Sequence, residues 1–187
     1  DMIRRLSATP VIAAPSGQAG ALLGLAQEEG KALYDRHTWQ AFQTEYTFST
    51  ANGTASYALP TGFDQMIKGT VFNRTRRRQM FGDLSPMQWQ RTQASLVTMV
   101  NPAFRIKGDL FFISPTPTAI ETIAYEYITK NWCRSAALAG QSRWAADTDT
   151  GVLDEELTTL GIIWRFKSAK GLDYAESMND YEIKVNK

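Results

Sequence analysis

Hydrophobic residues recur along the chain with two periods, one typical of helices near both ends and one typical of strands in the middle. Three segments, which begin near Gln18, after Asp147 and after Gly171, place apolar or small side chains three to four positions apart. This spacing predicts three helices that each bury one stripe. The stripes comprise Ala19, Leu22, Ala26, Gly30, Leu33 and His37 in the first helix, Leu153, Leu157, Leu160 and Trp164 in the second, and Tyr174, Met178, Tyr181 and Val185 in the third.

Between the helical regions, apolar and polar residues alternate, as they do in strands that bury one face. The alternating stretches 44–50 and 55–59 flank an Asn-Gly pair, which predicts a β-hairpin. Two further hairpins are expected, one with the basic turn 74–77 and one around residues 107–109, and residues 120–132 alternate again. The middle of the chain is therefore expected to form an antiparallel sheet.

Helices at both ends of a continuous block of strands predict an α+β fold, with the sheet inserted into a helical domain. A short helix is expected inside the block, since Ser85 can cap it and Pro86 suits its first position. Before the first helix, two prolines and the lack of any helical period predict an extended arm. The expected parts are an arm over 1–16, a helical domain from 17–42 and 150–187, and an inserted antiparallel β domain over 43–149 with one short helix.

The composition is that of an ordinary folded protein, with 43% hydrophobic and 21% charged residues among 187. Its formal net charge is +1, so the molecule as a whole has no long-range attraction for nucleic acid or for anionic membranes. No stretch approaches the roughly 20 apolar residues of a membrane span. We therefore expect no membrane partner, and we expect any electrostatic partner to be bound locally.

Candidate catalytic and metal-binding residues are few. Cys133 and His37 are the sole residues of their types, which leaves no zinc-binding cluster, and we expect packing and helix-end roles for them. Glu121 and Glu126 lie five positions apart on one strand and so point to opposite faces, unlike a glycosidase pair. The sequence around Gly24 to Ala32 departs from a phosphate loop, and the acidic segment 147–156 is expected to be a helix start, with a cation site as the alternative. No catalytic residue, cofactor or metal site is predicted.

The densest positive charge lies in the turn of the second expected hairpin, at Arg74, Arg76, Arg77 and Arg78. Charged side chains are common at solvated hairpin tips. The functional alternative is contact with nucleic-acid phosphate or with an acidic protein groove. Both interpretations place the cluster on the surface.

Four segments, 22–42, 44–66, 104–132 and 153–182, resemble in that order the head-to-tail adaptor proteins of tailed, mainly short-tailed, bacteriophages, also called connector or head-completion proteins. The similarity covers most of residues 20–182, and its motifs are structural and not catalytic. The most specific pieces are the corner Tyr57, Leu59, Pro60, Phe63 and Asp64, the prolines Pro115 and Pro117, and the segment from Lys170 to Tyr174.

This resemblance implies a virion protein, made in the host cytoplasm, that forms a ring of commonly twelve subunits. The ring would dock on the portal protein, extend the DNA channel with non-specific contacts, and provide a platform for tail or nozzle proteins. We expect the corner from Tyr57 to Asp64 to be structural. The expected portal contacts are Tyr181, Ile183 and Val185, and the expected contacts with DNA or a partner are Arg74, Arg76, Arg77 and Arg78.

Three alternatives remain at this stage. A virion-associated cell-wall glycosidase would need a cleft with two inward carboxylates. A nucleic-acid-binding module built on the sheet would expose aromatic side chains such as Tyr125 and Tyr127 for base stacking. Another ring protein of the tail would share the same composition.

Overall fold

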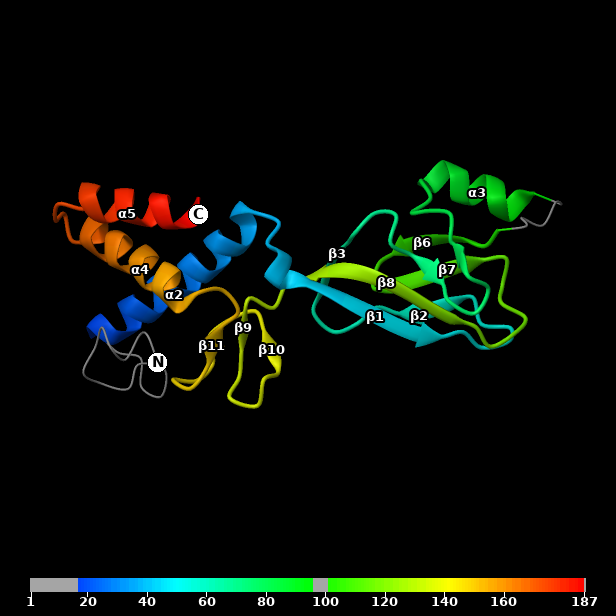
Figure 1. Cartoon of the computed structure of the whole chain (residues 1–187), viewed down its shortest axis with the longest axis horizontal. Helices are drawn as coiled ribbons and strands as arrows, with labels where there is room; N and C mark the ends of the chain where they lie inside the picture. Colours follow the sequence, from blue (N-terminus) through cyan, green and yellow to red (C-terminus); the bar gives the residue numbers. More distant parts are fainter. Residues whose placement is uncertain (1–16, 96–100, 187) are drawn as a thin grey trace. The chain divides into compact units, whose positions relative to one another are not determined.

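Strand β8 (Thr122–Thr129) is the centre of the larger sheet because both of its edges are paired (Figure 1). β1 (Gln43–Ser49) runs antiparallel along one edge. Along the other edge lie β3 (Phe63–Met66) and then β4 (Phe72–Asn73), and β5 (Arg78–Gln79) pairs with β4. β1 is the last strand on its side, so its outer edge has no strand partner among the described residues.

A second, three-stranded antiparallel sheet packs against the first through aromatic rings. Its strands, in spatial order, are β2 (Ser56–Ala58), β7 (Leu110–Ser114) and β6 (Ala103–Lys107). Phe111 of β7 is fully buried and stacks on Tyr125 of β8, with ring centroids 5.5 Å apart. The shared core explains why both sheets alternate in hydrophobicity. It comprises Val71, Met80, Phe104, Phe111, Ile113, Ile123, Tyr125 and Tyr127.

The hairpin expected across the Asn-Gly pair is wrong, because β1 and β2 belong to different sheets. The turn carries the chain from one sheet to the other, and Gly53 N donates to the carbonyl of Pro117 at 2.9 Å. Phe48 and Tyr57 still meet across the core with centroids 4.9 Å apart. The two strands thus bury facing side chains without sharing backbone hydrogen bonds. The other two expected hairpins, β4 with β5 and β6 with β7, are confirmed.

The computed structural model describes residues 17–95 and 101–186, and the expected arm over 1–16 lies outside the described residues. The chain divides into two compact units, a β unit over 43–129 and a helical unit built from the segments on either side of it. The helical unit contains α2 (Gly17–Arg36), α4 (Glu155–Ala169) and α5 (Ala175–Val185). A 3-10 turn (Gln40–Phe42) and three short strands complete it, β9 (Cys133–Arg134), β10 (Gly140–Gln141) and β11 (Thr150–Gly151).

The α+β class is confirmed, but residues 130–149 pack with the helices and not with the inserted sheet. Trp132 packs directly against Gly30 of α2, where an added Cβ would come within 2.3 Å of the indole. The side-chain amide of Gln27 exchanges two hydrogen bonds with the backbone of Trp144. β9 and β10 of this segment therefore belong to a small separate sheet, and Trp132 and Trp144 hold the segment against α2. Among the described helices, none is both long and apolar enough to cross a membrane.

α3 (Pro86–Ala94) confirms the short helix expected inside the β unit. Its N-terminus has a capping box, in which the hydroxyl of Ser85 accepts from Gln88 N and the side chain of Gln88 accepts from Ser85 N. None of its residues is buried. Capping, rather than burial, therefore defines where this helix begins.

The crossing of α2 and α4 depends on a glycine. Gly161 lies against the fully buried Glu29, and a Cβ added there would come within 2.2 Å of the carboxylate. Glu29 Oε2 accepts from Nε of Arg165 at 2.6 Å, one turn further along α4. The absence of a side chain at Gly161 thus allows an ion pair to form between the two helices.

Replacement of Gly161 by Ala should destabilise the protein by about 1–3 kcal/mol, because the new methyl group overpacks the contact with Glu29. Gly24→Ala is the matched control, since nothing lies within 4 Å of a Cβ at that helical position. It should stabilise the protein by about 0.5–1 kcal/mol through helix propensity. Urea denaturation followed by circular dichroism measures both, and equal midpoints for the two variants would contradict the packing argument.

Candidate functional site

The four arginines in the turn between β4 and β5 and at the start of β5, here called the arginine tip, divide into two pairs with different environments. Nη2 of Arg74 donates to the carboxylate of Glu45 at 2.6 Å. Nε of Arg76 donates to Oε1 of Glu121 at 2.6 Å. These two guanidinium groups are thus occupied within the chain.

The buried carboxylate of Glu121 organises the tip. Its side chain is 9% exposed, and its second oxygen accepts from the side-chain amide of Asn73. Oδ1 of Asn73 in turn accepts from the backbone N of Arg76 at 2.9 Å, which closes the turn. Glu121 N donates to Thr50 Oγ1 and its carbonyl accepts from Thr50 N, so the start of β8 is fixed as well. Each carboxylate oxygen of Glu121 therefore accepts a hydrogen bond from a side chain of the tip or of β4.

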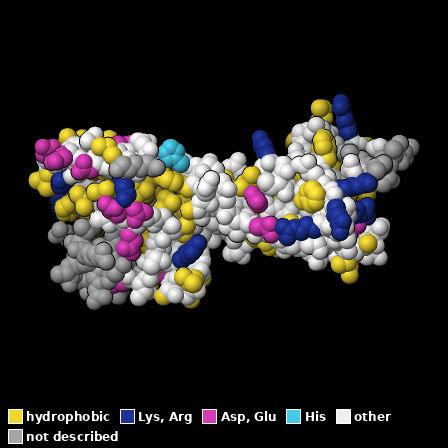
Figure 2. Space-filling model, in the orientation of Figure 1, with side chains coloured by type: hydrophobic (Ala, Val, Ile, Leu, Met, Phe, Trp, Pro, Cys, Tyr) yellow, Lys and Arg dark blue, Asp and Glu magenta, His cyan; other side chains and the backbone are white. Residues whose placement is uncertain are grey.

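Arg77 and Arg78 are exposed, and neither side chain has a hydrogen bond or ion pair among the described residues. Arg77 has a φ of +55°, a left-handed conformation that Gly and Asn adopt more readily than Arg. Figure 2 shows Lys and Arg side chains at several places on one face of the β unit. Two of the four predicted contact residues thus remain available to a partner.

The corner from Tyr57 to Asp64 connects the two sheets. The hydroxyl of Tyr57 donates to the carbonyl of Thr54 at 2.7 Å and accepts from Ala51 N, which braces the turn before β2. Leu59 packs against the aromatic core, and Phe63 N donates to the carbonyl of Pro60. The ring of Phe63 stacks on Tyr127 with centroids 5.5 Å apart, and Asp64 is exposed. These contacts support a structural role for the corner.

The three expected portal contacts on α5 lie in different environments. Tyr181 and Val185 are 3% and 6% exposed and pack in the core of the helical unit, whereas Ile183 is 51% exposed. Burial, with a further contribution from Glu29, raises the pKa of Tyr181. Tyr181 and Val185 therefore hold the helix in place, and Ile183 is the member of this set that a partner can reach.

Charged pairs fix α5 to its neighbours. Glu182 binds Arg36 of α2, and this hydrogen bond holds the pKa of the carboxyl below its usual range. Lys184 binds Glu156 and Asp154 at the start of α4, which raises the pKa of the ammonium group. The pairs are exposed, so their contribution is orientation more than stability.

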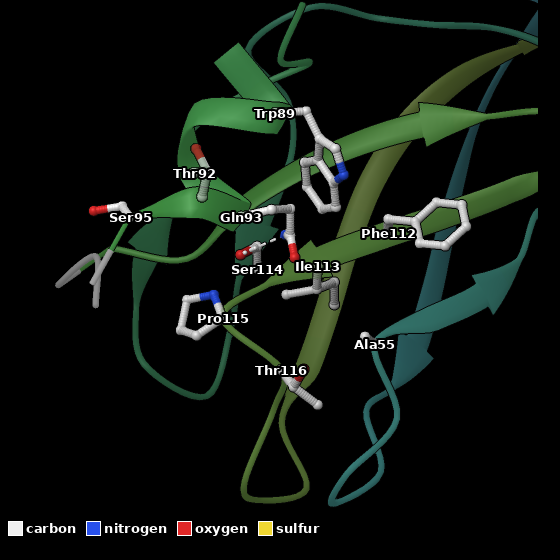
Figure 3. A pocket seen from close by; sticks show the side chains of 10 residues that line it. All are labelled: Ala55, Trp89, Thr92, Gln93, Ser95, Phe112, Ile113, Ser114, Pro115 and Thr116. Carbon is white, nitrogen blue, oxygen red and sulfur yellow. Dashed lines mark hydrogen bonds between the residues drawn. The ribbon is translucent and has the colours of Figure 1, made fainter. Parts of the chain in front are cut away.

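An open groove of about 440 Å³ lies between α3 and β7 in the β unit (Figure 3). Trp89 of α3 packs edge-on to Phe112 of β7, with centroids 6.2 Å apart, and Gln93 donates to the hydroxyl of Ser114 at 3.2 Å. The sequence pattern did not indicate this groove, although Trp89, a large aromatic residue in an otherwise polar short helix, was the available signal. No carboxylate, histidine or cysteine is among the described residues that line it.

Two further hollows, as lined by the described residues, do not present the residues of a hydrolase. Among the described residues, a hollow of about 530 Å³ next to β5 is lined by no acid, and a smaller one of about 210 Å³ is lined by one acid, Glu121. Because that carboxylate is bound by Arg76 and Asn73, it is not free to act as an acid or base. These hollows therefore give no support to the glycosidase alternative.

The remaining candidates are also accounted for by local contacts. Tyr125 and Tyr127 are 1% and 6% exposed, so these two rings are not available for the base stacking expected in the nucleic-acid-module alternative. His37 is exposed and packs edge-on against Trp39. In the acidic segment, Asp149 accepts from Ala145 N and Ala146 N, and Asp154 caps α4. Within the described residues, no group of three metal-binding side chains is present.

Removal of the side chain of Arg76 should destabilise the protein by about 1–2 kcal/mol, because Glu121 is then left buried with one oxygen unpaired. Arg78→Ala is the control, since this exposed side chain has no partner in the described chain, and it should change stability by less than about 0.5 kcal/mol. Thermal unfolding measures both. The effect of Arg76→Ala should shrink when Glu121 is also replaced by Gln; additive effects would contradict direct coupling.

Cys133 should not react as a nucleophile in the folded protein. Burial, and secondarily the nearby carboxylate of Asp149, raises the pKa of its thiol to about 12, so the thiol is protonated at pH 8. We expect iodoacetamide to leave Cys133 unmodified at pH 8 and to alkylate it completely in urea, as measured by intact mass. Rapid alkylation of the folded chain would show that the thiol is accessible and ionised.

The sequence model of the family described as SU10 adaptor protein matches residues 1–184. Among curated proteins, none matches this sequence significantly. The match covers nearly the whole chain, including both segments of the helical unit and the entire β unit. The chain therefore belongs to the SU10 adaptor protein family, a family of phage structural adaptor proteins.

Proposed function

We propose that this protein forms a ring at the head-to-tail interface of the virion, where it docks on the portal protein, extends the DNA channel and provides the attachment platform for tail or nozzle proteins. The observation that carries the proposal is the family match over residues 1–184. The resemblance implies a ring of about twelve copies. In such a ring, two different surfaces of each subunit contact its two neighbours, and the rotation between subunits closes the ring.

Two features of the described surface support repeated contacts between copies. The outer edge of β1 leaves a row of backbone groups without a strand partner, and such edges commonly pair with another chain. Large apolar side chains are also exposed on both units, and such exposure suits residues that are covered on assembly. Those with more than half of their surface exposed are Phe81, Met87, Ile120, Leu138, Leu172 and Ile183.

Ile183 is the residue that we propose for the portal contact on α5. Its neighbours Tyr181 and Val185 anchor the helix in the core, so an isoleucine between them is held out on a rigid element. The pairs of Glu182 with Arg36 and of Lys184 with Glu156 fix the rotation of the helix. A fixed apolar side chain loses little entropy on binding, which favours its use as an anchor.

Native mass measurement of the protein mixed with its portal protein tests the proposal directly. We expect one complex that contains many copies of both chains in a fixed ratio. Ile183→Asp should weaken this complex at least tenfold, or about 1.4 kcal/mol, because a carboxylate would be placed in an apolar contact.

Asn179→Asp is the matched control, since it adds the same charge to an exposed position of α5 and should leave the complex intact. Both substitutions are at exposed positions, so both variants should unfold within about 0.5 kcal/mol of the original protein. A persistent monomer in the presence of the portal protein would refute the adaptor proposal. An unchanged complex for Ile183→Asp would refute the proposed contact alone.

A further inference from the structure

We propose that Arg77 and Arg78 bind the phosphate backbone of duplex DNA. This inference rests on the proposed function, in which the genome passes through the ring, and it names a partner for the two arginines that have none among the described residues. Arg74 and Arg76, which the sequence pattern grouped with them, serve the structure of the tip instead.

The first argument is the distribution of charge at the tip. Each acid that contacts the tip is already bound, Glu45 by Arg74 and Glu121 by Arg76. The guanidinium groups of Arg77 and Arg78 are exposed and have no acidic partner among the described residues. Each offers five donors in a planar fork that matches phosphate oxygens. The tip is thus a local positive site on a nearly neutral protein.

The second argument is the backbone of Arg77. Its φ of +55° lies in the left-handed region, where a side chain costs free energy that glycine would avoid. The residue closes the turn before β5, a place that Gly or Asn suits better. Within the described chain, no hydrogen bond or ion pair of the Arg77 side chain offsets this cost. An exposed side chain at an unfavourable φ, with no partner among the described residues, is typical of a position that binds a ligand.

Contact with the phosphate backbone also suits DNA that moves through the proposed ring. Phosphate contacts carry no sequence information, so any genome sequence can pass them. Two arginines on a molecule of net charge +1 give weak, salt-sensitive binding, which holds DNA near the tip without stopping it. Base stacking would oppose movement, and the aromatic residues Tyr125 and Tyr127 are buried away from the surface. Contact with the phosphate backbone is therefore the form of DNA binding that the guanidinium groups of Arg77 and Arg78 suit.

Fluorescence anisotropy of a labelled, random-sequence duplex of about 30 base pairs tests the inference with the full chain, between about 25 and 200 mM KCl. The double variant Arg77→Gly/Arg78→Ser should bind at least tenfold more weakly at low salt. The slope of log affinity against log salt should become less steep by about 0.9 for each phosphate that the variant no longer neutralises. Arg77→Gly alone should weaken binding while its thermal midpoint stays the same or rises, because glycine adopts this φ without strain.

Lys68→Ser/Lys107→Ser is the matched control, because it removes two positive charges from exposed positions of the same unit, one in a turn and one at the end of β6. It should keep the affinity within about threefold of the original protein, as expected from a change in the general field alone. Equal weakening by the two double variants, or unchanged binding by the tip variant, would overturn the inference. So would a tip variant that keeps DNA binding but no longer assembles with itself or the portal protein, since the partner would then be a protein acid.

The two proposals fail in different ways. A tip variant that forms the portal complex normally but loses DNA binding supports the inference on its own. If the original protein binds DNA through the tip but forms no complex with the portal protein, the adaptor proposal fails and the DNA contact stands.

Discussion

The carboxylate of Glu121 determines how the arginine tip is divided. It sits where β8 begins, is almost fully buried, and has Asn73 on one oxygen and Arg76 on the other. Asn73, which donates to this carboxylate, closes the turn by accepting from Arg76 N. The backbone of Glu121 is hydrogen-bonded to Thr50, which fixes the end of β1. Arg74 and Arg76 thus occupy the two acids that contact this turn, and Arg77 and Arg78 have no acidic partner among the described residues.

The helical unit also contains a buried carboxylate that is paired with an arginine. Glu29 is fully buried on α2 and binds Arg165 of α4, and Gly161 provides the space for this contact. A buried ion pair adds little net stability compared with apolar packing, but loss of one partner is costly. In each unit, a buried carboxylate with an arginine therefore fixes the geometry of elements whose apolar contacts alone would permit sliding. A protein that fits between other proteins benefits from surfaces held at fixed positions.

The hydrophobic pattern was sufficient to predict the α+β class, the capped helix at Ser85 and the hairpins of β4 with β5 and β6 with β7, because each of these depends on residues close in sequence. It failed at the Asn-Gly turn, where a good hairpin signal carries the chain between two sheets. Phe48 and Tyr57 contact each other from two facing sheets. Such a contact produces the same alternation of apolar and polar residues as a hairpin, so the pattern does not distinguish the two arrangements. The charge cluster was found from sequence, but its division was not, since Glu45 and Glu121 lie 29 and 45 residues away from their arginines.

The uncovered edge of β1 also has a consequence for the life of the free subunit. The strand is seven residues long and contains neither proline nor lysine, the residues that commonly discourage unwanted pairing. If a neighbouring subunit covers this edge in the proposed ring, an unassembled subunit exposes it and can pair with the same edge of another copy, so synthesis faster than assembly would favour aggregates over particles. Timing of production, as much as affinity, would then limit how many virions are completed.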